Sequence, residues 1–194
     1  MTGLRERKKE RTRETIQREA LSLITSRGYD ATTCEQIAAA AYVSPATLYR
    51  YFATKEDIVL QDVYDPLIAA AVRAWPVSDA PLTAARRGFA DALADVYQGD
   101  LEAIRQRTAL ILSVPALRAR SREQQDSLVT HLADAFAERG GRSADDLGIE
   151  VAAAICATVV GVAVVRWAGQ GGDLPSHVDD AFAALSDLTK RARR

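Results

Sequence analysis

Between Ser44 and Lys55 the chain gathers hydroxyl, phenol, guanidinium and ammonium side chains within one short stretch. A guanidinium such as that of Arg50 can grip guanine O6 and N7 with two parallel hydrogen bonds, so it is the best candidate for reading a base. The phenols of Tyr49 and Tyr51 can reach phosphate oxygens on either side of such a contact. These residue types predict a surface that binds double-stranded DNA.

The same stretch has the signals of a short helix. Ser44 is a favourable N-cap, and Pro45 suits the first turn because its missing N–H costs nothing there. At about 100° per residue, Leu48 and Phe52 share the inner side of this helix with Pro45. The opposite side carries the residues predicted to face base edges: Ala46, Thr47 and Arg50.

A second short helix precedes it. Thr33 and Gln36 form a Thr-x-x-Gln capping box, and the helix that follows buries Ile37 and ends near Tyr42. Two short helices joined by a tight turn are typical of a helix-turn-helix, whose second helix enters the major groove.

A third helix should follow the helix-turn-helix. Thr54 and Asp57 form another capping pair, and the apolar periodicity predicts one continuous helix from Thr54 to Trp75, stopped by Pro76. Lys55 lies in its first turn, where exposed backbone N–H groups and the helix dipole favour a phosphate. We expect this helix to act as a lever between DNA and the rest of the protein.

The first eighteen residues carry seven basic side chains and three acidic ones, in a chain whose formal net charge is only −1. The second half of this stretch belongs to a helix expected over residues 10–27, which Gly28 ends. Arg11 and its basic neighbours are candidates for salt-sensitive contacts to phosphates or the minor groove. The alternative is a solvated helical face on which glutamates pair with arginines, and both interpretations can hold together.

Two stretches closely resemble the DNA-binding domain of the TetR family: residues 33–41 and the sequence VSPATLYRYFATKED at residues 43–57. The resemblance covers about residues 10–70 and implies homodimers that bind palindromic DNA. Tyr51 departs from the family pattern, in which this position is often His. The resemblance implies DNA contacts at Thr33, Thr47, Tyr49, Tyr51 and Lys55. With the candidates named above, the predicted DNA contacts are Arg11, Thr33, Ser44, Pro45, Ala46, Thr47, Tyr49, Arg50, Tyr51 and Lys55.

The sequence predicts an all-α protein of two domains. Residues 1–54, with a linking helix to about residue 74, form the DNA-binding domain, and residues 75–194 form a larger helical domain. The family resemblance implies that the larger domain binds a small effector and that its last two helices form a four-helix bundle with a partner. Its remaining helices are expected over residues 82–98, 101–113, 115–139, 144–168 and 176–191.

The helix over residues 144–168 is hydrophobic nearly all round, which independently favours an interface between subunits. Its small residues permit close helix packing. The predicted dimer contacts are Ala153, Ala157, Val160, Gly161, Val164, Phe182 and Leu185.

A finer resemblance concerns the effector. The opening GLRERKKERTR and the sequence ILSVPALRAR at residues 111–120 resemble regulators of the mycofactocin-system type. That subgroup has a C-terminal domain associated with acyl-CoA-like ligands, so an acyl-CoA-like effector is implied and no cofactor is expected. Core packing is the favoured alternative for the aromatic and aliphatic candidates, and a surface role explains Arg105 equally well. The candidates are Phe89, Tyr97, Arg105, Leu112, Phe136 and Trp167.

Cysteine and histidine usage argues against a metal site and against catalysis. The two cysteines, Cys34 and Cys156, are far apart, and His131 and His177 are isolated, so no zinc-ligand spacing exists. No Gly-x-Ser-x-Gly, phosphate loop or dinucleotide fingerprint occurs, and we expect no enzyme.

No apolar segment follows the basic N-terminus, and the longest uncharged stretch, residues 151–165, is short for a bilayer span. We therefore expect a cytoplasmic protein with no membrane partner. The sequence predicts a ligand-responsive regulator, most simply a homodimeric repressor released by a small molecule. The alternatives are a helical scaffold that binds proteins without DNA and, less favoured, an enzyme.

Overall fold

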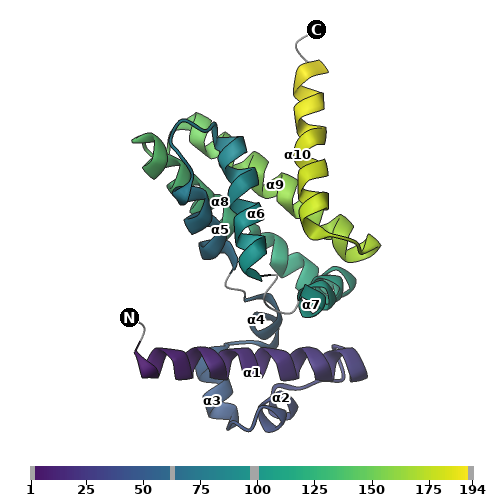
Figure 1. The fold of residues 1–194 in the computed structure, drawn as a ribbon. Helices are drawn as coiled ribbons and strands as arrows, with labels where there is room; N and C mark the ends of the chain where they lie inside the picture. The colour runs from purple at the N-terminus through teal and green to yellow at the C-terminus, as the bar shows by residue number, and fades with distance from the viewer. Residues whose placement is uncertain (1–2, 62–63, 97–100, 192–194) are drawn as a thin grey trace. The chain divides into compact units, whose positions relative to one another are not determined.

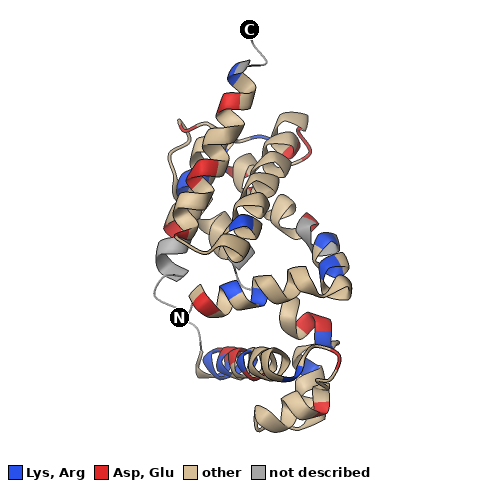
Figure 2. Ribbon diagram, turned by 90° about the vertical axis from the view of Figure 1, so that its right-hand side faces the viewer, with Lys and Arg blue, Asp and Glu red and all other residues tan. Residues whose placement is uncertain are grey.

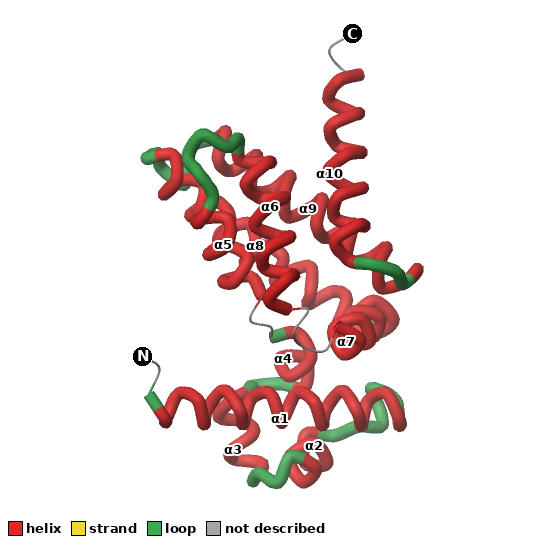
Figure 3. Tube along the Cα trace, viewed as in Figure 1, coloured by secondary structure: helices red, strands yellow, loops and turns green. Residues whose placement is uncertain are grey.

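The computed structural model describes residues 3–61, 64–96 and 101–191. Within these ranges all regular structure is α-helical, so the all-α prediction is confirmed (Figure 3). The chain divides into two compact units. The N-terminal unit comprises Met1–Gln61 and Leu110–Arg120, and the C-terminal unit comprises Asp62–Ala109 and Ser121–Arg194.

The N-terminal unit is built on a long first helix that lies over two short ones (Figure 1). Its helices are α1 (Leu4–Arg27), α2 (Cys34–Ala40), α3 (Pro45–Tyr51) and α4 (Lys55–Leu60). Their apolar faces meet in one core, to which Ile16, Ile37, Leu48, Phe52 and Ile58 contribute fully buried side chains. The helix-turn-helix arrangement follows the sequence prediction, whereas α1 begins at Leu4 rather than near residue 10.

The prediction of one continuous helix from Thr54 to Trp75 is wrong. α4 ends at Leu60, Gln61 has an extended backbone (ψ 123°), and α5 (Tyr64–Ala74) begins after two residues outside the described ranges. Pro66 explains the break, because proline has no N–H to continue a helical ladder and is tolerated only in a first turn, where it lies here.

Side chains of α1 donate hydrogen bonds to the C-terminal end of α4, which ends at Leu60. The Gln17 amide donates to the carbonyls of Ile58 (3.2 Å) and Gln61 (2.6 Å), and Arg13 donates to the Gln61 side chain (2.9 Å). The last carbonyls of a helix have no partner within it, so the two bonds from Gln17 replace those that a longer helix would have made.

The corner between α7 (Leu101–Ser113) and α8 (Pro115–Gly140) belongs to the N-terminal unit. Leu117 is fully buried there in an apolar cluster with Ile24 and Val59. The Arg120 guanidinium also lies 3.0 Å from a carboxylate oxygen of Asp57. This corner contains residues 111–120, the stretch that resembles regulators of the mycofactocin-system type.

The C-terminal unit holds α5, α6 (Pro81–Val96), most of α7 and α8, α9 (Leu147–Gln170) and α10 (Leu174–Arg191). Its core contains the buried aromatic side chains Phe89, Phe136 and Trp167. α5 and α6 pack closely at Gly88, where a Cβ would lie 2.6–2.9 Å from atoms of Val72. Only glycine fits this contact.

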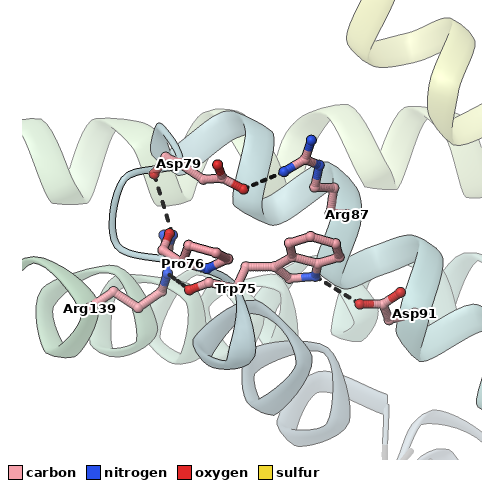
Figure 4. Close-up of polar contacts among 6 residues, drawn as sticks. All are labelled: Trp75, Pro76, Asp79, Arg87, Asp91 and Arg139. Carbon is pink, nitrogen blue, oxygen red and sulfur yellow. Dashed lines mark hydrogen bonds and ion pairs between the residues drawn. The ribbon is translucent and has the colours of Figure 1, made fainter.

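One polar network ties the α5–α6 loop to α8 (Figure 4). Arg139 donates to the carbonyls of Trp75 (3.1 Å), Pro76 and Asp79 (3.3 Å). Arg87 bonds the Asp79 carboxylate (2.6 Å) and stacks over the Trp75 ring at 4.8 Å. The loop is therefore held in place by bonds from Arg139 to its backbone carbonyls and from Arg87 to its side chains.

α9 is apolar nearly all round, as the sequence indicates, with a mean hydropathy of 2.3 over its most apolar eighteen residues. By length and composition alone it is the one helix among the described residues that could cross a membrane. Core helices of globular proteins meet the same criterion. One side of α9 does line the core of the C-terminal unit, through Ala153, Cys156 and Trp167.

Candidate nucleic-acid interface

The turn between α2 and α3 is held by backbone and capping hydrogen bonds. The Val43 N–H donates to the Ala38 carbonyl (2.9 Å), which closes the turn. α2 begins with the predicted capping box, in which Thr33 and Gln36 bond each other's backbone N–H groups at 3.3 and 3.1 Å. At the start of α3 the Ser44 hydroxyl accepts from the Thr47 N–H (3.1 Å).

α3 presents the side that the sequence predicts. Leu48 and Phe52 are buried, whereas Ala46 and Arg50 are exposed. Thr47 is half-buried, and its hydroxyl bonds that of Ser44 at 2.9 Å. Pro45 differs from the helical-wheel expectation, because it is exposed at the first turn instead of facing the core.

The two tyrosines of α3 have different environments. Tyr49 is half-exposed, and hydrogen bonding to the Cys34 thiol raises its pKa, with the nearby Glu35 acting in the same direction. The Tyr51 ring is partly buried against the core, and the Arg50 guanidinium lies 5.8 Å from its centre. Tyr49 is therefore linked to α2, while Tyr51 supports the side chain of Arg50.

Lys55 lies in the first turn of α4 as predicted, but its ammonium faces protein. It donates to the carbonyls of Tyr29 (2.7 Å) and Thr32 (2.9 Å) and lies 4.0 Å from the centre of the Tyr29 ring. The Tyr29 hydroxyl in turn donates to the Glu56 carboxylate. Sequence spacing gave no sign of this network, because its partners are far apart in the chain.

The basic N-terminal stretch is helical from Leu4, and Arg11 is exposed on it. Lysine and arginine residues are interspersed with glutamates along this helix, as the blue and red segments of its ribbon show (Figure 2). Arg13 is turned inward instead, with its guanidinium 5.5 Å from the centre of the Phe52 ring. The charged surface therefore belongs to the helix α1.

Within the C-terminal unit, the described candidate effector residues do not line its open groove. Phe89, Phe136 and Trp167 lie in the core of the C-terminal unit. Arg105 pairs with Glu102 at 2.7 Å on α7, and Leu112 lies in the N-terminal unit. Tyr97 lies outside the described residues. An open groove of about 820 Å³ occurs elsewhere in the C-terminal unit, between α6 and α10.

The candidate dimer residues are largely used within the subunit. Ala153, Ala157, Val160 and Phe182 are buried in the core of the C-terminal unit, and the remaining three are only partly exposed: Gly161, Val164 and Leu185. The opposite side of α9 is exposed and apolar. It carries Leu147, Val151, Ala154, Val162 and Val165, which we call the α9 stripe.

Comparison with known proteins assigns both parts of the chain. Residues 16–61 match the family model of the bacterial regulatory proteins of the tetR family, and residues 79–190 match that of the MftR C-terminal domain. The HTH-type transcriptional regulator TcmR of Streptomyces glaucescens is 36% identical over 151 residues, which cover 74% of this chain and 67% of that protein. The chain belongs to the TetR family. It is a transcriptional regulator with an N-terminal helix-turn-helix domain and a C-terminal ligand-binding domain.

Solved structures agree with the TetR-family fold. NalD, the secondary repressor of the MexAB-OprM efflux pump of Pseudomonas aeruginosa, has a TM-score of 0.57 at 16% identity and covers 93% of this chain and 96% of its own. The fatty acid degradation regulator FadR of Bacillus halodurans has a TM-score of 0.55 at 18% identity, covering 95% and 96%.

Proposed function

We propose that this TetR-family regulator binds a palindromic operator as a homodimer and represses transcription by occupying promoter DNA. The observation that carries the proposal is α3, which is capped at Ser44, anchored by the buried Leu48 and Phe52, and exposed at Ala46 and Arg50. A rigidly held short helix with one exposed side fits the major groove. Two such helices in a symmetric dimer would contact half-sites one helical turn or more apart. Such a regulator acts in the cytoplasm, where the promoter DNA lies.

Within each half-site we assign base reading to Arg50, because its guanidinium is exposed and steadied by the Tyr51 ring. Tyr49 and Tyr51 flank it on the phosphate side, and Lys55 contributes positive potential beside them. The other assigned contacts surround α3 or extend along the DNA backbone: Arg11, Thr33, Ser44, Pro45, Ala46 and Thr47.

We assign the dimer contact to the α9 stripe. Because Ala153 and Ala157, which the sequence predicts for this role, are buried inside the subunit, a partner would meet the exposed side. That side carries Val151, Val162 and Val165. The exposed Ala184 and Leu188 lie one turn apart on α10 and form a second apolar row. A four-helix bundle of α9 and α10 with their partners would remove these rows from water.

The effector proposed for the C-terminal domain is acyl-CoA-like, and its support is the match of residues 79–190 to the MftR C-terminal domain. Binding would release DNA by favouring a dimer in which the two α3 helices no longer match the half-site spacing. A ligand shifts such an equilibrium only by its difference in affinity for the two arrangements.

The test of DNA binding is a selection from duplexes with a randomised 30-base-pair core, using the purified full-length protein. Repeated capture and sequencing should enrich one palindromic duplex. Failure to enrich any sequence at low salt, with the protein folded and dimeric, would contradict the proposal and favour a protein-binding scaffold.

The effector proposal has a separate test. Calorimetry with acyl-CoA thioesters of increasing chain length should detect binding, and the bound thioester should lower affinity for the selected duplex. Coenzyme A without an acyl chain is the matched control. Absence of binding heat across the series, while the protein still binds its duplex, would contradict an acyl-CoA-like effector.

A further inference from the structure

Tyr42 stands out in the turn between α2 and α3. Its φ is 55°, and it is the one non-glycine residue with positive φ among the described parts of the chain. Its side chain is also 96% exposed, the highest value among the large apolar residues there. Side-chain-bearing residues avoid this left-handed conformation, which glycine adopts without steric cost.

The turn itself imposes this backbone conformation. The Ala41 N–H donates to the Ile37 carbonyl (2.9 Å), the Tyr42 N–H to Ala39 (3.2 Å) and the Val43 N–H to Ala38 (2.9 Å). Ala38 and Ala41 on its inner side are buried. The hydrogen bonds need a left-handed residue at this position, but they do not need a tyrosine.

The side chain gains nothing from the subunit that compensates for this conformation. At 96% exposure the ring leaves nearly all of its apolar surface in water. An aromatic side chain usually contributes to stability by burying that surface. A tyrosine held in a strained turn and left exposed therefore points to a contact outside the subunit.

The position of Tyr42 identifies that contact. It precedes Ser44, the N-cap of α3, by two residues, and Ser44, Pro45 and Ala46 next to it are all exposed. Tyr42 thus extends the exposed surface of the helix-turn-helix past the start of α3. A side chain here would meet the wall of the groove that α3 enters.

We propose that Tyr42 contacts the sugar–phosphate backbone of the operator beside the major groove, an inference that rests on the proposed function. Its hydroxyl donates to a phosphate oxygen, and its ring covers the adjacent deoxyribose. Backbone contacts of this kind fix the register of a protein on DNA without reading bases. The contact is neutral, so it displaces no condensed counterion.

The experiment compares the wild-type protein with Tyr42→Gly on the palindromic duplex enriched by the selection described above, over a series of salt concentrations. Because glycine suits the turn, the variant should melt at the same temperature or about 1–3 °C higher. Its dissociation constant should rise about ten-fold. The slope of log affinity against log salt should stay parallel to that of the wild type.

Two further variants serve as controls. Tyr42→Phe keeps the ring and loses the hydroxyl, so its affinity should lie between those of the wild type and Tyr42→Gly. Arg11→Ala, which removes an exposed charge, should flatten the salt slope if that residue contacts phosphate.

Equal affinity of the wild type and Tyr42→Gly would overturn the inference. A fall in melting temperature of several degrees together with the lost affinity would also overturn it, because Tyr42 would then support the fold. If the wild-type protein enriches no duplex at all, the proposed function fails instead, so the two failures are distinguishable.

Discussion

The ammonium of Lys55, which the sequence predicts to contact DNA, also stabilises the fold of the N-terminal unit. Its ammonium bonds two backbone carbonyls, those of Tyr29 and Thr32, and both residues are buried. An ammonium has three donors, so these two bonds leave one for a phosphate oxygen. Lys55 thereby holds the segment between α1 and α2 against α4 while contributing positive potential beside α3.

We predict that Lys55→Ala lowers the free energy of unfolding by about 1–3 kcal/mol, because the Thr32 carbonyl loses its ammonium donor and the Tyr29 carbonyl keeps only the Thr32 N–H, at 3.3 Å. Urea denaturation of the wild type and the variant measures this difference. Lys55→Arg, which retains the charge, is the matched control, and its free energy of unfolding should fall by less than that of Lys55→Ala. A variant as stable as the wild type would show that the two carbonyls do not depend on Lys55.

Arg50 is expected to act on specificity instead. Arg50→Ala should reduce discrimination at one base pair of each half-site by about 1–3 kcal/mol, whereas Lys55→Ala should weaken binding to all sequences alike. Competition titrations with single-base variants of the selected duplex separate the two effects. A uniform loss on every sequence for both variants would refute the assignment of Arg50 as the base reader.

The Tyr29–Glu56 hydrogen bond gives the N-terminal unit a pH dependence. The bond from Tyr29 lowers the pKa of Glu56 from its ordinary value of 4.5. Because the folded-state pKa lies below the unfolded one, this contribution is complete above about pH 4.5 and is lost as the pH falls through the folded-state value.

The stability deficit of Tyr29→Phe relative to the wild type should therefore stay constant above about pH 5 and shrink as the pH is lowered further to about 3. Thermal unfolding at intervals across this range gives the comparison. A deficit that stays constant with pH would mean that the carboxylate gains nothing from the tyrosine.

Among the helices, the ends that depend on neighbouring residues were predictable from the sequence, whereas those that depend on residues far apart in the chain were not. Capping residues such as Thr33 and Ser44 correctly mark the starts of α2 and α3, because a cap acts within one turn. Pro66 also carried a local signal for the break after α4, but apolar periodicity continued across it and favoured one long helix. The bonds from Gln17 to the end of α4 join residues 41 and 44 positions apart, which spacing does not reveal.

The contact between α5 and α6 depends on Gly88. We predict that Gly88→Ala lowers the free energy of unfolding by about 1–3 kcal/mol, because its Cβ would overlap Val72 and force the helices apart. Gly169→Ala is the matched control, since a Cβ on this α9 glycine meets nothing within 4 Å. The free energy of unfolding of this control should rise by about 0.5–1 kcal/mol, because alanine has a higher helix propensity than glycine. Equal effects of the two substitutions, measured by urea denaturation, would contradict the close contact.

At the scale of the whole molecule, α9 shows why the dimer surface was difficult to predict. A helix that is apolar all round has no polar side to indicate which residues face inward. Small side chains such as Ala153 and Ala157 suggested a subunit contact, but they pack within the subunit's own core. Only the structure distinguishes that side from the α9 stripe.

We predict that Val151→Glu combined with Val162→Glu dissociates the dimer, because each partner would bury unpaired carboxylates. The dimer dissociation constant should rise by about two orders of magnitude or more, measured by sedimentation equilibrium. Gln170→Glu adds the same side chain at an exposed position of α9 outside the stripe and should leave the dimer intact. A doubly substituted protein that remains dimeric would exclude the stripe as the interface.

The most direct test of the account is fluorescence anisotropy with the selected palindromic duplex and with a duplex in which one half-site is scrambled. A homodimer that reads both half-sites through α3 should bind the intact palindrome about a thousand-fold or more tightly than unrelated DNA. Scrambling one half should remove most of that preference. Equal affinity for the intact and scrambled duplexes would contradict the central claim that this protein is a symmetric, sequence-reading regulator.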